Sequence, residues 1–247
     1  MPTISPRDRE RIQQAFADNP AALRDALVRL EDGEPIEYIL GRVDFLGVTV
    51  DLSHRPMIPR PETAFWVARA IEELQGRPGP LRLADTFSGA GNVGITLLKN
   101  LPESRVDLSE FDAALIPQIE INVLLNGIDP ERARIFAGDT LEGLTGSYDA
   151  IFAVPPYVPD AALPELDPEM IRFEPHLAFF GGEDGHRFHR ALVAGAWDLL
   201  APGGTLYMEA DMDHEPAIRA MLPGTRWSSI EFWSDPYGAT PNVVLRK

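Results

Sequence analysis

The sequence contains no cysteine and only two lysines, Lys99 and Lys247, among its 247 residues. Without cysteine it has no disulfide framework, no thiolate nucleophile and no cysteine-based zinc site. No apolar run approaches the about 18 residues that a membrane-spanning helix needs, and the N-terminal residues lack the apolar core of a signal peptide. These absences predict a cytoplasmic protein without a membrane partner.

Basic residues are also scarce relative to acidic ones. The chain carries 38 acidic and 22 basic residues, which gives a formal net charge of −16. Nucleic-acid-binding surfaces are typically basic, because neutralising phosphates releases counterions and supplies much of the affinity. The charge balance therefore predicts that neither DNA nor RNA is the main partner.

Proline and glycine divide the chain into an N-terminal part and a longer repeating pattern. Residues 5–31 predict two short helices, each beginning at a proline that follows a capping residue. Residues 43–52 alternate as a hairpin does, and a helix is expected over 62–75. The Gly- and Pro-rich residues 75–80 end that helix and mark a boundary. We expect a helical cap over residues 1–32, linker strands with a hairpin and a helix over 33–78, and a catalytic domain over 79–247.

From residue 81 onward, segments with the pattern of strands alternate with segments with the pattern of helices. Strands are expected at residues 81–85, 105–109, 134–137, 149–154, 205–209, 226–233 and 241–246. Helices are expected at residues 91–100, 113–126, 186–200 and 215–222. This alternation predicts an α/β fold with a parallel, doubly wound sheet and an antiparallel pair of strands at its edge.

The first expected strand of this region ends in Asp85 and continues into a glycine-rich loop and a helix. Gly89 and Gly91 allow the backbone to approach a ligand, and the helix N-terminus offers free amide donors. Glu110 ends the next strand 19 residues after Gly91, the spacing at which a carboxylate accepts hydrogen bonds from ribose hydroxyls. Together with Asp139 after the third strand, this pattern indicates a nucleotide-type cofactor site.

A second candidate site follows the strand expected at residues 149–154. Pro155 and Pro156 fix the backbone and remove two amide donors, so they end this strand in a rigid elbow. Tyr157 is then presented at the carboxyl end of the strand, where open α/β sheets bind their ligands.

Taken in order, these motifs resemble the protein-glutamine N5-methyltransferases of the HemK/PrmC type, within the class I S-adenosylmethionine (SAM) methyltransferases. The resemblance covers about residues 33–247 and includes a near-signature at residues 58–63 and a presumed linker strand at 33–41. It implies a Rossmann-like seven-stranded fold with a small N-terminal helical cap, and SAM as the cofactor. The cofactor-binding residues that it implies are Arg60, Pro61, Thr63, Asp85, Phe87, Ser88, Gly89, Gly91, Glu110, Phe111, Asp139, Thr140 and Val154.

The sequence departs from this family at the double-proline elbow. The family's loop reads Asn-Pro-Pro-Tyr and its Asn binds the acceptor amide, whereas Val154 offers neither a donor nor an acceptor. Phe87 replaces the first Gly of the cofactor loop, and His214 takes the place of the Gln usual after Glu209. These changes predict an apolar slot whose catalytic residues are Val154, Pro155, Pro156, Tyr157 and Phe87.

We therefore expect SAM-dependent alkyl transfer on a small molecule rather than on a release-factor glutamine. Its most specific form is the intramolecular cyclisation of SAM to azetidine-2-carboxylate with release of methylthioadenosine. N-methylation of a small amine, an amino acid or a protein glutamine is an alternative, and a non-catalytic SAM-binding protein is another. SAM is the expected small-molecule ligand, and the protein is expected to be a monomer or a homodimer.

Two further groups of polar residues are given little weight. His186 and His189, three residues apart on an expected helix, could bind a metal, but no third ligand follows in the pattern, so no metal is expected. His214 is expected at the surface, and the acidic residues between 167 and 174 are expected in a solvated lid loop.

Overall fold

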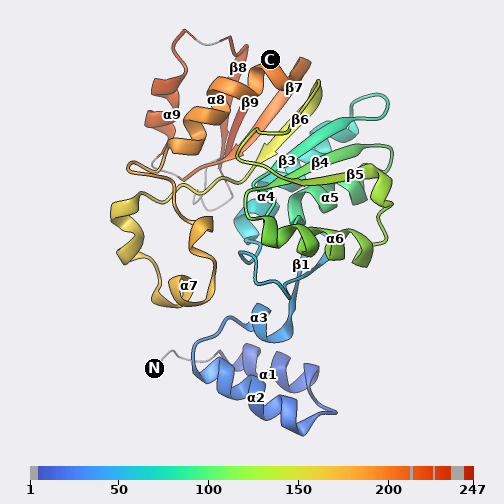
Figure 1. Ribbon diagram of the computed structural model, residues 1–247, viewed down its shortest axis with the longest axis vertical. Coiled ribbons are helices and arrows are strands. Elements are labelled where there is room, and N and C mark those ends of the chain that lie inside the picture. The colour runs from blue at the N-terminus through green and yellow to red at the C-terminus, as the bar shows by residue number, and fades with distance from the viewer. Residues whose placement is uncertain (1–4, 212–213, 225, 235–241) are drawn as a thin grey trace.

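A computed structural model describes residues 5–211, 214–224, 226–234 and 242–247 of the chain. These residues form a seven-stranded sheet covered by helices on both faces, a separate two-stranded hairpin and an N-terminal cap of short helices (Figure 1). The predicted α/β fold is confirmed. In the described parts of the chain, no helix combines the length and the apolar character that crossing a membrane requires.

The cap contains α1 (Pro6–Ala15), α2 (Pro20–Glu31) and α3 (Ile36–Leu40). Both predicted helices begin at a proline, because its fixed φ suits the first helical position and its missing N–H is not needed there. The linker strand expected at residues 33–41 is wrong. This segment forms α3 instead, which begins after Pro35 and ends at Gly41, whose φ of 72° closes the helix in the left-handed conformation.

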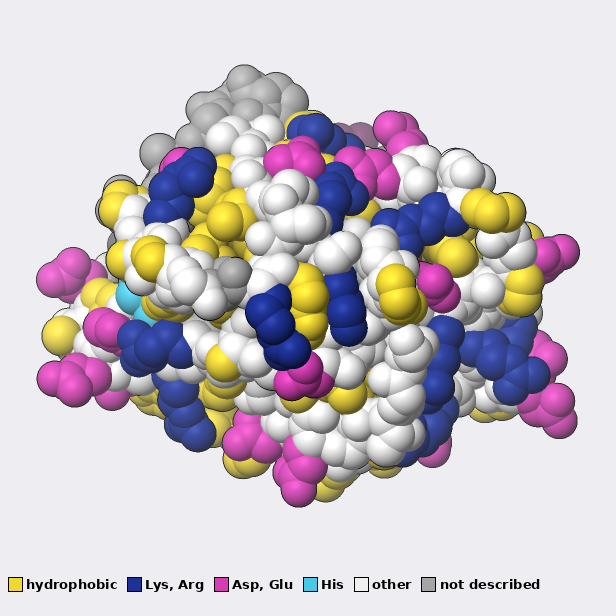
Figure 2. All heavy atoms as spheres, turned by 90° about the horizontal axis from the view of Figure 1, so that it is seen from above, with side chains coloured by type: hydrophobic (Ala, Val, Ile, Leu, Met, Phe, Trp, Pro, Cys, Tyr) yellow, Lys and Arg dark blue, Asp and Glu magenta, His cyan; other side chains and the backbone are white. Residues whose placement is uncertain are grey.

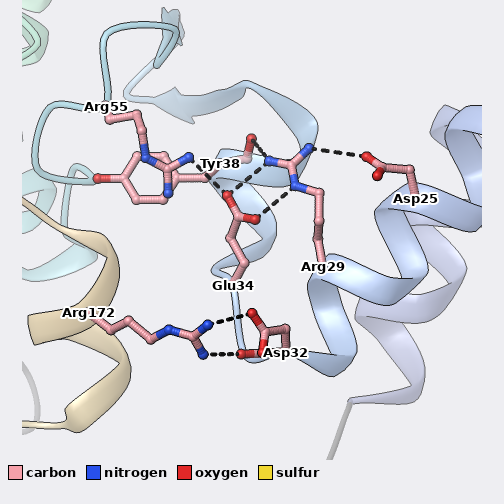
Figure 3. A network of polar contacts seen from close by, with 7 residues as sticks. All are labelled: Asp25, Arg29, Asp32, Glu34, Tyr38, Arg55 and Arg172. Carbon is pink, nitrogen blue, oxygen red and sulfur yellow. Dashed lines mark hydrogen bonds and ion pairs between the residues drawn. The ribbon is translucent and has the colours of Figure 1, made fainter.

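Ion pairs join the cap to two other parts of the chain (Figure 3). The Glu34 carboxylate accepts hydrogen bonds from Arg29 Nε at 2.8 Å and from Arg55 Nη1 at 2.9 Å. Arg172, on α7 (Pro168–Phe173), donates to the Asp32 carboxylate at 2.6 Å. The cap is therefore held against both the segment after the hairpin and the helix that follows the double-proline elbow.

The hairpin and the sheet follow the predicted order closely. The hairpin consists of β1 (Arg42–Phe45) and β2 (Val48–Asp51). The sheet strands are β3 (Arg82–Thr86), β4 (Arg105–Glu110), β5 (Ala133–Ala137), β6 (Tyr148–Ala153), β7 (Leu200–Glu209), β8 (Ser229–Trp233) and β9 (Asn242–Arg246). Their order is β5-β4-β3-β6-β7-β9-β8, with the first five parallel and β9 antiparallel to both β7 and β8, as predicted for the edge. Residue 241, expected at the start of the last strand, lies outside the described residues.

The remaining helices connect these strands. They are α4 (Pro61–Gln75), α5 (Asn92–Asn100), α6 (Ile116–Leu125), α8 (Arg187–Leu199) and α9 (Glu215–Met221). Single turns of 3-10 helix cover Ala113–Leu115, Pro130–Arg132, Asp160–Glu165 and His176–Ala178.

Two apolar cores lie on opposite faces of the sheet. One packs α4, α5, α6 and the hairpin against the sheet and includes Trp66, Leu83 and Leu108. The other packs α8 and α9 against the sheet and includes Ile151 and Leu206. Because successive strand residues point to opposite faces, one strand contributes to both cores. In β6, for example, Phe152 belongs to the first core and Ile151 to the second.

Charges of both signs are interspersed on the face of the molecule seen from above in Figure 2. Lys and Arg side chains stand there in separate groups, among apolar side chains and acidic ones. The acidic excess of the chain, with its formal net charge of −16, therefore does not give this face a uniform sign.

Candidate functional site

The candidate site lies where the chain reverses its direction of travel across the sheet. From β3 the chain adds β4 and β5 on one side, and it then returns to place β6 and β7 on the other. Open α/β sheets bind ligands outside the carboxyl ends of their strands at such a switch point. Both predicted sites, the glycine-rich loop after β3 and the double-proline elbow after β6, therefore lie at one edge of the sheet, on neighbouring strands.

The loop between β3 and α5 is built around the buried carboxylate of Asp85. Its Oδ2 accepts a hydrogen bond from the Gly94 amide at 2.8 Å, and Ser88 Oγ donates to the Asp85 carbonyl at 2.8 Å. Gly91 caps α5 with a φ of 80°, and a Cβ on it would lie 2.9 Å from Ile119 Cγ2. The predicted glycine is thus required both by the backbone conformation and by the packing of α6.

Glu110, at the end of β4, faces the same loop. Its Oε2 accepts from the Gly89 amide at 2.7 Å and its Oε1 accepts from the Asp112 amide at 2.9 Å. Burial raises the pKa of Glu110 above its ordinary value. A Cβ placed on Gly89 would meet no atom within 4 Å, so the loop leaves open space beside the carboxylate. A carboxylate next to an open glycine turn suits a ligand that carries hydroxyl groups.

Three further predicted cofactor residues lie at this edge, one after β4 and two after β5. Phe111 directly follows it and is 59% exposed, so its ring is available to a flat ligand. Asp139 and Thr140 follow β5, the strand beside β4, and Thr140 Oγ1 donates to Asp139 Oδ1 at 2.8 Å. The structure thus brings together the carboxyl ends of three neighbouring strands, as the sequence predicts.

Asp85 gives the free protein a pH-dependent stability. Burial raises the pKa of Asp85 to about 7, against about 3.9 in an unfolded chain. A carboxyl group with a raised pKa favours the folded state while it holds its proton, and this contribution is lost as pH rises from about 4 to about 7.

We expect Asp85→Asn, measured without SAM, to gain free energy of unfolding relative to wild type as pH rises from 5 to 8. The expected gain is roughly 2–4 kcal/mol, because the variant no longer ionises a buried group. Urea unfolding at both pH values measures it. Stability curves that stay parallel for the two proteins would contradict this role of Asp85.

Val154 directly follows β6, which lies between β3 and β7 in the sheet. Ala153, the last residue of β6, pairs with Thr86 of β3 and with Met208 of β7, the residues that precede Phe87 and Glu209. Val154 is half-buried and packs on the core that contains Trp66. Of the following residues, Pro155 is buried, whereas Pro156 and Tyr157 are half-buried.

Phe87 has a left-handed backbone, with a φ of 61°. This conformation favours glycine, and a bulky residue held in it costs on the order of 1 kcal/mol. The Phe87 ring packs edge-on against Phe188 of α8, with 5.1 Å between the ring centroids. Packing against α8 therefore supports a residue that the backbone alone would disfavour.

The buried carboxylate of Glu209 connects α4 to the end of β7. Its Oε2 accepts from Thr63 Oγ1 at 2.6 Å and from Trp66 Nε1 at 2.8 Å, while burial raises the pKa of Glu209. Tyr157 has a raised pKa as well, first because it is buried and then because of the charge of Glu209. The hydroxyl of the predicted residue Thr63 therefore donates its hydrogen bond to the carboxylate of Glu209.

Arg60, which precedes Pro61 at the start of α4, is held by Glu174. Arg60 Nη2 lies 2.5 Å from Glu174 Oε1, and the Ile58 amide donates to Glu174 Oε2 at 3.0 Å. The expectation that Glu174 belongs to a solvated loop is wrong, because its side chain is buried and fully engaged by these groups. Glu174 ties the near-signature segment at 58–63 to the segment after the elbow.

Three histidines lie close together, next to the ring of Tyr157. His186, His189 and His214 are all buried, so the expectation of a surface His214 is wrong. Burial lowers the pKa of His189 to about 4. The spacing of His186 and His189 indicates that they share one face of a helix. Nothing in the spacing indicates that His214, which precedes α9, lies beside them.

Comparisons with known proteins agree with this geometry. The model of the methyltransferase small domain family matches residues 71–176. The chain is 32% identical over 212 residues to the release factor glutamine methyltransferase of Deinococcus radiodurans, covering 86% of this chain and 74% of that protein. The chain belongs to the release factor glutamine methyltransferase family. The enzyme of that name from Bacteroides thetaiotaomicron is 33% identical over 219 residues, which cover 87% of this chain and 77% of that one.

The fold agrees with that of solved methyltransferases. A methyltransferase from Pyrococcus furiosus superposes with a TM-score of 0.60, over 81% of this chain and 89% of that chain, at 18% identity. This chain of the release factor glutamine methyltransferase family is therefore an enzyme with the class I methyltransferase fold, and SAM is its methyl donor.

The expected reaction is corrected by the same comparisons. Relatives that match most of the chain are release factor glutamine methyltransferases, which contradicts alkyl transfer on a small molecule and the cyclisation of SAM to azetidine-2-carboxylate. That expectation rested on the presence of Val154 in place of Asn. Similarity along most of the chain is stronger evidence about the reaction than a difference at one position. The assignment of individual residues to cofactor and acceptor stays a prediction.

Proposed function

We propose that the chain transfers a methyl group from SAM to a side-chain amide nitrogen, that of a glutamine in a release factor, the activity for which its relatives are named. The observation that carries this proposal is the arrangement at the switch point. A rigid double-proline elbow and Tyr157 lie on the strand next to the glycine-rich loop, within a chain of this family.

The residues after β3, β4 and β5 fit the cofactor. The open turn at Gly89, the free amides at the start of α5 and the carboxylate of Glu110 offer donors and acceptors of the kind that a nucleoside needs. SAM supplies a methyl group that its sulfonium already activates for transfer. Asp85 fixes the loop to the start of α5 through the hydrogen bond that it accepts from the Gly94 amide.

The acceptor amide would be held at the elbow. Pro155 and Pro156 give the slot rigid apolar walls, and Val154 adds only an apolar contact. Glu209 follows Met208, the partner of Ala153 on the adjacent strand β7, and we propose that its carboxylate accepts a hydrogen bond from the amide N–H₂. The transfer converts SAM to S-adenosylhomocysteine, and the amide nitrogen gives up one proton, which we propose passes to the carboxylate of Glu209. Holding the nitrogen in line with the methyl group lowers the barrier to this attack.

Other expectations belong to this proposal as well. We also propose the division into a cap over 1–32, a linker part over 33–78 and a catalytic part over 79–247, and a cytoplasmic monomer or homodimer. The acidic charge balance supports the further proposal that nucleic acid is not a partner.

The direct test is to incubate the purified protein with SAM and a purified release factor. Mass spectrometry should find one added methyl group on a glutamine of the release factor, and none on a release-factor variant in which that glutamine is replaced by alanine. Consumption of SAM without any methylated protein, or a methyl group on a residue other than glutamine, would contradict the proposal.

A further inference from the structure

Three of the five histidines of the chain converge on one point. One ring nitrogen from each of His186, His189 and His214 lies within 4.8 Å of those of the other two. The ring centroids of His186 and His214 are 4.4 Å apart, and that of His189 lies 5.6 Å and 5.5 Å from them. His189 belongs to the first turn of α8 and His186 caps it, whereas His214 precedes α9.

The cluster is buried and carries ring nitrogens that have no partner. His189 is 0%, His214 8% and His186 9% exposed. Nδ1 of His186 and Nδ1 of His189 are buried and lack a hydrogen-bond partner. An unpaired buried polar atom is unfavourable, so native proteins rarely keep two in one place without a ligand or a bound water.

The second nitrogen of His189 is already fixed in the way that metal-binding histidines require. His189 Nε2 lies 3.0 Å from the carbonyl oxygen of Glu209, to which only an N–H can donate. Its Nδ1, which is buried without a hydrogen-bond partner, therefore carries the lone pair of the neutral ring. A histidine that donates its outer N–H to a backbone carbonyl is the usual arrangement around a metal ion.

We propose that His186, His189 and His214 form a binding site for a transition-metal ion of the Zn²⁺ class, with a fourth position open to water or to a ligand. Imidazole nitrogens suit Zn²⁺, Ni²⁺ and Cu²⁺, and three histidines with one open position are an established zinc arrangement. Ligand nitrogens about 2.0–2.1 Å from the ion lie about 3.3 Å apart in a tetrahedron. The ring nitrogens therefore need to draw together by up to about 1.5 Å, and the 3.2 Å contact from the Asp211 amide to His214 Nδ1 would adjust with them.

The metal would join two elements directly behind the elbow. The Tyr157 ring centroid lies 5.6 Å from that of His214 and 6.5 Å from that of His189. The same turn of α8 carries Phe188, which packs on Phe87. A bound ion would thus fix the start of α8 to His214, which precedes α9. It would also limit the movement of Tyr157 and Phe87, whose rings contact these residues. The site does not depend on the identity of the methyl acceptor.

Metal binding can be measured on the full chain without any enzyme assay. Untagged protein is stripped of metal with a chelator, dialysed, and titrated with Zn²⁺ in competition with a chromophoric chelator. We expect one high-affinity Zn²⁺ per chain and a higher melting temperature in its presence, because the ion binds the folded state alone. Because the chain lacks cysteine, absorption bands of bound Co²⁺ would report nitrogen and oxygen ligands only.

Two variants, one at the start of α8 and one before α9, decide the matter. His186→Gln and His214→Gln should each weaken Zn²⁺ binding by more than about tenfold and abolish the rise in melting temperature. His54→Gln, at an exposed histidine outside the cluster, is the matched control and should bind like wild type. Testing both ligands keeps the result decisive if one variant fails to fold. A wild-type protein that binds Zn²⁺ no more tightly than a folded cluster variant, or a control that loses binding equally, would overturn the site.

Discussion

Replacing Val154 by Asn should accelerate methylation of the release-factor glutamine. Val154 stands where the resembling family has the Asn that binds the acceptor amide, and it offers no polar group. A hydrogen bond restored in a buried site contributes about 1–3 kcal/mol, which corresponds to a rate increase of roughly five- to 150-fold. Initial rates of methyl transfer at saturating SAM, compared between wild type and Val154→Asn, measure the effect.

The matched control for this substitution is Val154→Ala. It removes the same apolar contact with the core but adds no donor or acceptor, so it should be no faster than wild type. An Asn variant that behaves like the Ala variant would show that the amide is held elsewhere at the slot. Glu209, next to Val154 across the sheet, would then be the residue to replace.

Most of the fold could be predicted because the local rules agree with the global arrangement. Buried parallel strands read as apolar runs, and each proline that begins a helix in the cap fits the first helical position. The cofactor loop could be predicted because the φ of 80° at Gly91 is a local requirement of the turn into α5. The contact between Gly91 and Ile119 of α6 adds a packing requirement that the local sequence does not show.

The parts that could not be predicted depend on contacts between distant residues. Glu174 looks like a loop residue until Arg60, 114 positions earlier, is seen to pair with it. His214 joins His186 and His189 only because α9, which it precedes, packs against α8. Spacing along the sequence contains no signal for either contact, since both arise from how the elements pack.

The expectation of alkyl transfer on a small molecule is wrong for a related reason. Val154 removes one polar contact, but the sequence alone does not show that its neighbour on β7 is the buried carboxylate of Glu209. The loss of the Asn side chain at position 154 leaves the other groups around the acceptor slot in place, and all of these groups together determine what the slot binds. Similarity along most of the chain therefore outweighs a change at a single position.

Glu110→Ala should weaken SAM binding by about two to three orders of magnitude. A carboxylate that accepts hydrogen bonds from ribose hydroxyls contributes about 1.5–3 kcal/mol for each charge-assisted bond. The same carboxylate accepts from the Gly89 amide at 2.7 Å and from the Asp112 amide at 2.9 Å. Its loss would remove a ligand contact and also release the loop that supplies the other contacts.

Isothermal titration of SAM into the wild-type and variant proteins measures this loss, with circular dichroism to show that both are folded. Glu103→Ala is the matched control, because this exposed glutamate lies before the opposite end of β4, far from the carboxyl edge. A dissociation constant that changes less than about threefold in Glu110→Ala would remove Glu110 from the cofactor site. A large loss in Glu110→Ala alone would place the ribose at the carboxyl end of β4, beside the open turn at Gly89, and would leave the neighbouring elbow after β6 to the acceptor.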